Sequence, residues 1–118
     1  MKLKILDIGK MVPEFEAEKL FVLFGNSAPP ELRDISVIID FERNDDGIYF
    51  KEGSKLIISN QEYEITEVGN MANSNFHELG HLSIYLNEDM ETLPGAVHAV
   101  PDVFPKFNIC LLYTSDAA

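Results

Sequence analysis

Residues 55–68 read KLIISNQEYEITEV, and this stretch decides the fold class. Apolar and β-branched residues dominate Lys55–Ser59, and Glu62–Val68 alternates polar with apolar residues. That alternation is the two-residue period of a strand with one buried face. Asn60-Gln61 supplies the turn between the two runs. The stretch therefore predicts two consecutive strands rather than a helix.

Strand-like runs of the same kind recur along the chain, whereas helical patterns are scarce. The runs lie at Lys2–Gly9, Lys19–Phe24, Ile35–Phe41, Ile48–Phe50 and Leu82–Leu86. Asp46-Gly47 between two of them predicts a tight hairpin turn. Ala28–Asp34 predicts one helical turn, and Met71–Leu79 a short helix that ends at Gly80. We therefore expect an all-β (mostly β) fold, a small barrel-like single domain with one or two short helical turns.

The charge balance narrows the choice of partners. The 118 residues, enough for one domain, hold 20 acidic and 9 basic side chains, a formal net charge of -11. Such a surface repels phosphate backbones and anionic lipid, which disfavours nucleic acid and membrane surfaces and favours basic protein partners. Cys110 is the single cysteine, which indicates an intracellular, cytoplasmic protein. No apolar run approaches the roughly 18–20 residues of a membrane span, so we expect no membrane insertion.

Residues 77–81 read His-Glu-Leu-Gly-His, a literal H-E-x-x-H. On a helix, His77 and His81 would bind zinc and Glu78 would act as general base. The polar lead-in Asn70–Asn75 is weakly helical, and the strand pattern from Leu82 leaves His81 at or beyond the helix end. The sequence has no H-x-x-G-x-x-H extension, and Glu88, Glu91 and His98 are only loosely placed candidates for a third zinc ligand. A small zinc hydrolase is therefore the weaker hypothesis, and we expect no metal and no cofactor.

Three segments carry a family resemblance. They are EITEVGN at 64–70, NFHELGHL at 75–82 and LPGAVH at 93–98, preceded by SAPPELRDI at 27–35. In this order they resemble the glucitol/sorbitol-specific enzyme IIA component of the phosphoenolpyruvate-dependent sugar phosphotransferase system. The likeness covers about residues 3–107.

The resemblance implies a cytoplasmic phosphocarrier with a small β-barrel-like fold. Such a protein takes a phosphoryl group from the carrier HPr onto a histidine and passes it to the IIB unit of a membrane permease (IIB/IIC), which phosphorylates the hexitol. A neutral imidazole suits this role, because its unperturbed pKa of about 6.5 leaves a nucleophilic nitrogen at pH 7. The acidic surface suits a basic partner of the HPr kind.

The chain departs from the family at the acceptor position. The family's phosphoacceptor histidine aligns with Ile39, and no histidine precedes His77. His81 and His98 match histidines of the family motifs and are the candidate acceptors, whereas His77 falls at a variable position and is left out. The alternative is a regulatory paralogue that has lost phosphotransfer. Gly80 and the Pro94-Gly95 turn would hold the two candidates at strand ends, near one another.

The last ten residues break the preceding pattern. We expect an IIA-like β domain over residues 1–108 and a non-native or disordered tail over residues 109–118, because CLLYTSDAA resembles a translated sequencing-adapter stretch. The alternative is an ordinary final strand at Ile109–Tyr113. A barrel that lacked its closing strand would expose strand edges and permit a homodimer.

Overall fold

The computed structural model describes residues 2–58, 61–86, 91–109 and 112–116. Within these ranges the helical elements are a 3-10 helix η1 (Val12–Glu18) and the α-helices α1 (Pro30–Arg33) and α2 (Ala72–Leu79). The strands are β1 (Lys2–Ile8), β2 (Leu20–Gly25), β3 (Val37–Phe41), β4 (Lys55–Ile58), β5 (Gln61–Val68), β6 (Leu82–Tyr85), β7 (Ala96–Val100) and β8 (Leu112–Asp116). Cys110 lies outside the described residues.

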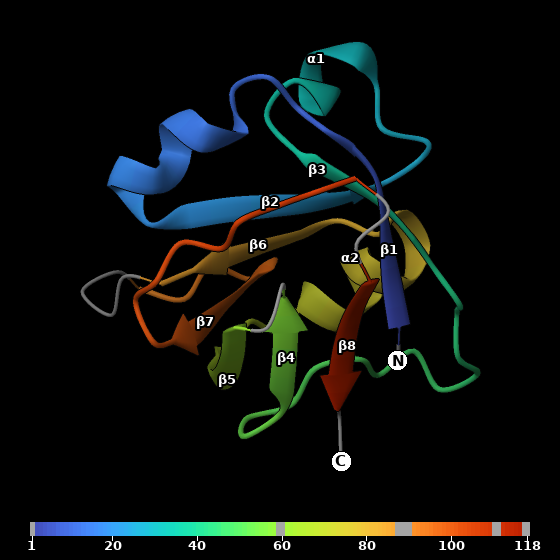
Figure 1. Ribbon diagram of the computed structural model, residues 1–118. Coiled ribbons are helices and arrows are strands. Elements are labelled where there is room, and N and C mark those ends of the chain that lie inside the picture. Colours follow the sequence, from blue (N-terminus) through green and yellow to red (C-terminus); the bar gives the residue numbers. More distant parts are fainter. Residues whose placement is uncertain (1, 59–60, 87–90, 110–111, 117–118) are drawn as a thin grey trace.

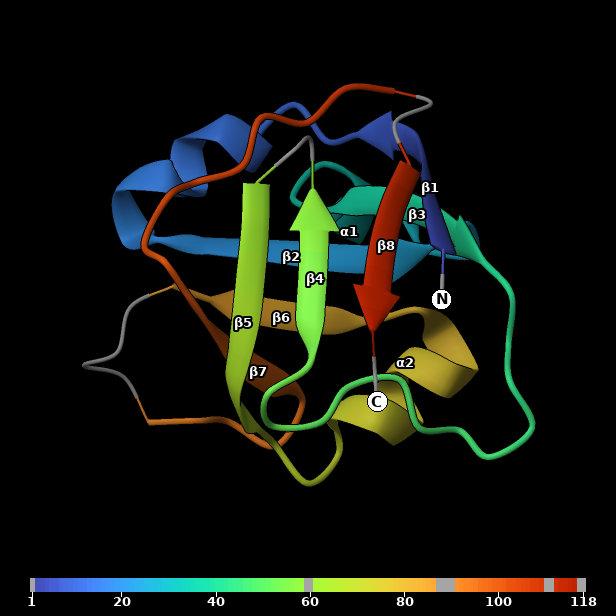
Figure 2. The same cartoon turned by 60° about the horizontal axis from the view of Figure 1, so that its bottom comes forward.

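The strands close into a barrel in the order β1-β3-β2-β6-β7-β5-β4-β8 (Figure 1). The pairs β2/β3 and β6/β7 are parallel, and the other neighbours are antiparallel. Figure 2 shows β5, β4 and β8 as one wall of the barrel, with β2 and β6 crossing behind them. The expected mostly β, barrel-like domain with short helices is confirmed. None of the described helices has the length and apolarity needed to cross a bilayer.

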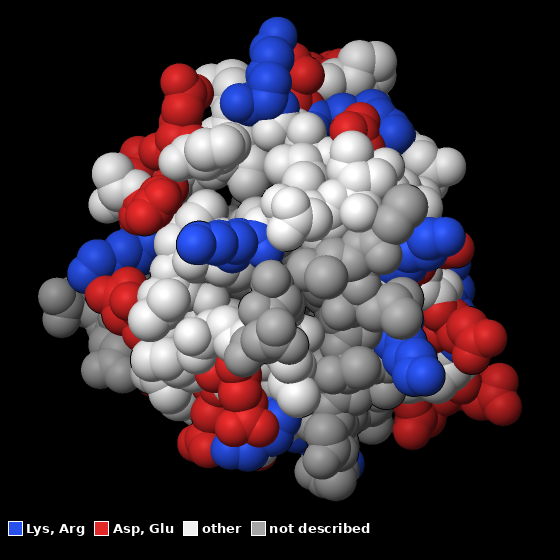
Figure 3. Space-filling model, viewed as in Figure 1, with Lys and Arg blue, Asp and Glu red and all other residues white. Residues whose placement is uncertain are grey.

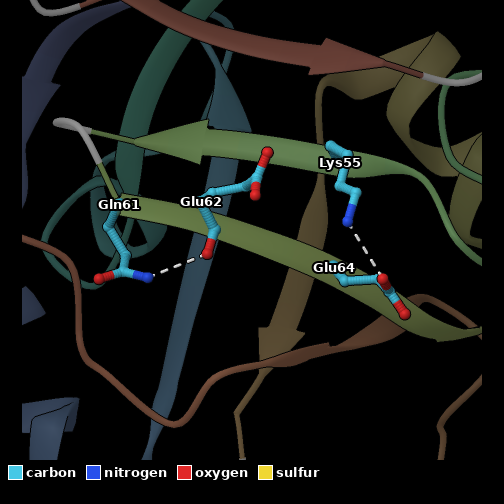
Figure 4. Close-up of polar contacts among 4 residues, drawn as sticks. All are labelled: Lys55, Gln61, Glu62 and Glu64. Carbon is cyan, nitrogen blue, oxygen red and sulfur yellow. Dashed lines mark hydrogen bonds and ion pairs between the residues drawn. The ribbon is translucent and has the colours of Figure 1, made fainter.

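The strands that decided the fold class pair as an antiparallel ladder. Leu56 lies opposite Tyr63 and Lys55 opposite Glu64, and the buried members of both strands alternate with exposed ones. Figure 4 shows the outer face, where Lys55 Nζ lies 3.2 Å from Glu64 Oε1. Both side chains are about half exposed, so this ion pair adds at most about 1 kcal/mol. The apolar alternation, rather than the ion pair, fixes the register.

The barrel interior is the main hydrophobic core, built from the inward-facing residues of the strands, with Phe76 of α2 also fully buried in it. A smaller apolar cluster lies on the outer face of β2 and β3. It consists of Phe24, Ala28 and Ile38, with Leu6 and Leu32 packed against it. Because Leu32 belongs to α1, this helix covers the outer face at that point. The helical turn predicted within Ala28–Asp34 is confirmed.

The strand predicted at Ile48–Phe50 is wrong, and so is the hairpin at Asp46-Gly47. The backbone N–H groups of Tyr49 and Phe50 both donate to the Asn73 side-chain oxygen, at 2.7 and 2.9 Å, so they join no strand ladder. The amide of Asn73 in turn donates to the carbonyl of Phe50 at 3.0 Å. The side chain of Asn73 in α2 therefore provides the hydrogen-bond partners of these backbone groups. Gly47 does take the positive φ expected of a turn, +69°.

The C-terminal stretch supplies the closing strand. β8 lies between β1 and β4 and pairs with both, so it completes the barrel. Residues 112–116 form a strand, whereas disorder was expected there. The alternative of a final strand agrees in kind, but β8 begins and ends three residues later than Ile109–Tyr113. The hypothesis that residues 109–118 are foreign to the natural protein stays a prediction.

Two glycines bring β2 and the end of α2 together. Gly80 ends α2 with φ +69°, as expected from the sequence, and a Cβ placed on it would lie 2.7 Å from the nitrogen of Gly25. A Cβ on Gly25 would lie 2.6 Å from the carbonyl oxygen of Leu79. Neither position has room for a side chain, and Gly80 also has a left-handed backbone that L-residues rarely adopt.

We predict that Gly80→Ala destabilises the protein by more than the roughly 1–2 kcal/mol that a left-handed alanine costs, because the new Cβ also clashes with Gly25. Gly53→Ala is the matched control, since Gly53 has φ +89° but nothing within 4 Å of a Cβ. Urea unfolding of both variants measures the difference. Equal losses of unfolding free energy would show that the close approach contributes nothing.

Candidate functional site

His81 lies where α2 meets β6, directly after Gly80. Its ring stacks on Phe24 of β2, with 4.8 Å between the ring centroids and 23° between the planes. The antiparallel register pairs Leu23 with Leu82, so Phe24 is the next residue along and faces His81 across the two strands. The side chain of His81 is half-buried by this contact. Among the described residues, no hydrogen bond engages either of its ring nitrogens.

The burial of His81 has a chemical consequence. Loss of water from the ring disfavours the charged imidazolium and lowers the pKa of His81 below 6.5. The ring is therefore neutral at pH 7 and offers one unprotonated nitrogen. A neutral, partly exposed imidazole with an uncommitted nitrogen is what a phosphoryl acceptor requires.

His98 lies on β7 and is only 4% exposed. Its register partners are Tyr85 of β6 and Glu67 of β5, and its ring meets the Tyr85 ring at 5.9 Å. Nε2 is buried and has no hydrogen-bond partner among the described residues. An unsatisfied buried nitrogen costs free energy. A partner protein would also have difficulty reaching it, because the ring has almost no exposed surface.

The two candidates are not brought together, contrary to the expectation from the sequence. In the parallel pair β6/β7, Ser83 lies opposite Ala96 and Tyr85 opposite His98. His81 is therefore four residues away from the level of His98, which corresponds to about 13 Å along the strands. The two histidines cannot act on the same phosphoryl group.

His77 on α2 has a fixed hydrogen-bond pattern. The backbone N–H of Asn44 donates to the hydroxyl of Tyr49 at 3.0 Å, and that hydroxyl lies 2.8 Å from Nδ1 of His77. Tyr49 is 1% exposed, so its hydroxyl needs this hydrogen-bond partner. One ring nitrogen of His77 is therefore held by a buried tyrosine.

The H-E-x-x-H motif does not form a zinc platform. α2 ends at Leu79 and Gly80 is left-handed, so His77 lies on the helix and His81 beyond its end. The two rings also turn to different partners, Tyr49 and Phe24. Within the described ranges, no three His, Cys, Asp or Glu side chains are grouped to hold a metal ion.

Ile39 lies beneath a surface hollow at the ends of β2 and β3. The hollow is lined by Gly25–Ser27, Ile39–Phe41 and Arg43. Ile39 itself is 1% exposed and lies opposite Gly25 in the parallel ladder. Gly25 also touches Gly80, which precedes His81. The hollow is therefore one cross-strand step from His81.

Comparison with known proteins identifies the family. The model of the PTS system glucitol/sorbitol-specific IIA component matches residues 1–110. The chain belongs to this family. A crystal structure of a PTS system IIA component from Enterococcus faecalis V583 is similar, with 30% sequence identity and a TM-score of 0.87, over 98% of this chain and 99% of that one. No match was found among curated proteins.

Family membership confirms the resemblance seen in the sequence. In this IIA chain, the position that we align with the family's acceptor holds Ile39, an apolar residue that cannot carry a phosphoryl group through nitrogen. The sequence analysis missed Arg43, which lines the same hollow. Nothing in the sequence around Arg43 signals a site, because its contacts are with backbone carbonyls of α2, 34 and 35 residues away.

We predict that His81 titrates below pH 6.5 in an NMR pH titration. Phe24→Ala should raise its pKa towards 6.5, because removing the stacked ring readmits water. Since the folded pKa is lowered, the unfolded chain binds the proton more readily, and stability falls as the pH drops below 6.5. A His81 pKa at or above 6.5 in the folded wild type would contradict the burial argument.

Proposed function

We propose that this chain is a cytoplasmic phosphocarrier of a glucitol/sorbitol-type phosphotransferase system, and that His81 accepts the phosphoryl group. The donor is HPr or a carrier like it, and the recipient is the IIB unit of a membrane permease. The observation that carries the proposal is a half-exposed histidine whose pKa is lowered by burial and whose ring nitrogens make no hydrogen bond to the described residues, two strands from the position aligned with the family's acceptor and separated from it by β2.

The transfer needs little covalent machinery. A lone pair of His81 attacks the phosphorus, the P–N bond of the donor's phosphohistidine breaks, and its electron pair stays on the donor ring. The ring proton on the other nitrogen of His81 is released to solvent or retained, according to the pH. In the second transfer, a nucleophile of the IIB unit attacks the phosphorus, the P–N bond to His81 breaks, and its electron pair stays on the His81 ring. The rest of the rate enhancement comes from positioning the two reacting groups and from electrostatic stabilisation of the transition state.

The charge of the chain fits a basic docking partner. The formal net charge of -11 attracts a partner with basic residues around its phosphohistidine. Figure 3 shows one face of the molecule, on which acidic and basic side chains are interspersed rather than gathered into a single patch. Long-range attraction would therefore raise the rate of encounter with the partner protein, but it does not determine which histidine accepts the phosphoryl group.

A second candidate is a regulatory relative that docks the same partners without accepting phosphate. The buried Ile39 favours it, because the aligned position then lacks the histidine that the family uses. The two candidates share fold, partners and docking face, and only phosphorylation distinguishes them.

We predict acid-labile phosphate on His81 when the protein is incubated with phosphoenolpyruvate, enzyme I and HPr, located by mass spectrometry. His81→Gln should abolish labelling because it removes the nucleophile. His77→Gln is the matched control and should keep the labelling, because His77 is not the proposed acceptor and its Nδ1 is hydrogen-bonded with Tyr49.

Two other results would reject this assignment. Phosphate on His98 would show that the buried histidine on β7 is the acceptor instead of His81. No phosphate on a folded protein, with HPr shown to be charged, would reject the phosphocarrier and leave the regulatory relative.

A further inference from the structure

Two turns that are far apart in the sequence meet at the lower end of β5 in Figure 2. One turn leads from β5 into α2, and the other leads into β7. The backbone N–H of Met71 donates to the carbonyl of Pro94 at 2.7 Å, and the carbonyl of Leu93 lies so close to Gly69 that no Cβ would fit there. These contacts bring Met71, Leu93 and Pro94 together on the surface.

The three side chains form an exposed apolar patch, called here the Met71–Leu93 patch. Met71 is 47% exposed, Leu93 is 49% exposed, and Pro94 is exposed as well. A single exposed apolar side chain is ordinary, but neighbouring ones mark a contact surface for a partner. Thr92 donates a hydrogen bond to the carboxylate of Glu67, which ties the segment before Leu93 to β5. The patch is therefore formed before any partner binds, which lowers the entropic cost of binding.

The patch lies in a part of the chain whose charged side chains are all acidic. Residues 56–105 contain eight Asp and Glu residues and no Lys or Arg. This stretch forms β5, α2, β6, β7 and most of β4, and the four strands are neighbours in the barrel. One side of the barrel therefore draws only negative charge from its own stretch of sequence.

The charged residues nearest to the patch keep this sign. Glu67 and Glu91 are both exposed, and each lies two residues before one of the touching turn residues, Gly69 and Leu93. The segment that bonds to Asn73 at the start of α2 continues with Lys51 and Glu52, whose charges are opposite.

Further along β5, Lys55 pairs with Glu64. The local excess of charge at the patch is therefore negative. An apolar centre with carboxylates beside it is complementary to a protein surface that has an apolar centre and a basic rim.

The patch and His81 lie within the reach of one partner. Met71, Ser74 and Glu78 are all exposed, and their spacing places them on one face of α2. α2 has eight residues, a length of about 12 Å, and His81 follows two residues after its end. A standard interface covers about 800 Å² on each protein, which is roughly 30 Å across. One docked protein can therefore cover the patch and reach His81.

We propose that the Met71–Leu93 patch, with Glu67 and Glu91, is the docking surface for the basic phosphocarrier that meets His81. The inference rests on the proposed function for its choice of partner. It adds the surface that holds this partner, at the far end of α2 from the acceptor. The apolar side chains supply the contact, and the carboxylates select a basic partner.

The first test is an NMR titration of the amide groups of the full chain with unphosphorylated HPr. This measurement reports docking without phosphotransfer. We expect shifts at Gly69–Met71 and at Thr92–Gly95, and binding that weakens as the salt concentration rises.

Variants of the apolar side chains test the contact itself. The double variant Met71→Gln/Leu93→Gln should weaken HPr binding about tenfold, because two apolar side chains no longer lose water on docking. Val103→Gln is the matched control, since Val103 is 47% exposed but lies outside the patch, and it should bind like the wild type. Thermal midpoints near that of the wild type would show that all variants are folded.

A charge reversal tests the choice of partner. Glu91→Lys should weaken HPr binding at least threefold more than Glu14→Lys, although both change the net charge equally and both positions are exposed. Glu14 lies on η1, outside the patch, and reports only the long-range attraction. In phosphotransfer from charged HPr, the patch variants should raise the half-saturating HPr concentration and leave the limiting rate unchanged.

Several outcomes overturn the inference. Equal binding by the double variant and the wild type would do so, as would equal losses in Glu91→Lys and Glu14→Lys or shifts confined to another face. Phosphotransfer to His81 that is unaffected in the patch variants would refute this inference alone. HPr docking at the patch with no phosphate on any histidine would refute only the phosphocarrier.

Discussion

The contact between Gly25 and Gly80 is the constraint on which the rest of the site depends. Because neither residue has a side chain, the end of β2 and the end of α2 approach to backbone contact. That approach starts β6 at Leu82 and sets His81 against Phe24. It also presents the last carbonyls of α2 to Arg43. One backbone contact thus arranges a neutral histidine, a fixed cation and the hollow over Ile39.

In the proposed account, the nucleophile lies on a different element from the position aligned with the family's acceptor. Ile39 occupies that position on β3 and supplies no nucleophile. His81 follows α2 and stacks on Phe24 of β2, so β2 separates it from β3. Burial lowers the pKa of His81, which favours the neutral ring that the proposed transfer needs.

Short sequence patterns predicted the elements whose structure depends on residues close together in the chain. The alternation in 55–68 predicted the β4/β5 ladder, and Gly80 predicted the end of α2. Ile48–Phe50 failed because its amides bond to Asn73, a contact 23 and 24 residues away that no periodicity encodes. Arg43 was missed for the same reason. The sequence placed His81 correctly beyond the helix, but its separation from His98 followed only from the β6/β7 register.

The most direct test of this account is an NMR spectrum of the histidine-ring nitrogens of the full chain during incubation with phosphoenolpyruvate, enzyme I and HPr. The account predicts that one ring nitrogen of His81 shifts on forming a phosphoramidate, and that the signals of His77 and of the buried His98 stay unchanged. A phosphoramidate on His77 or His98, or none on any histidine while HPr is charged, would contradict the account.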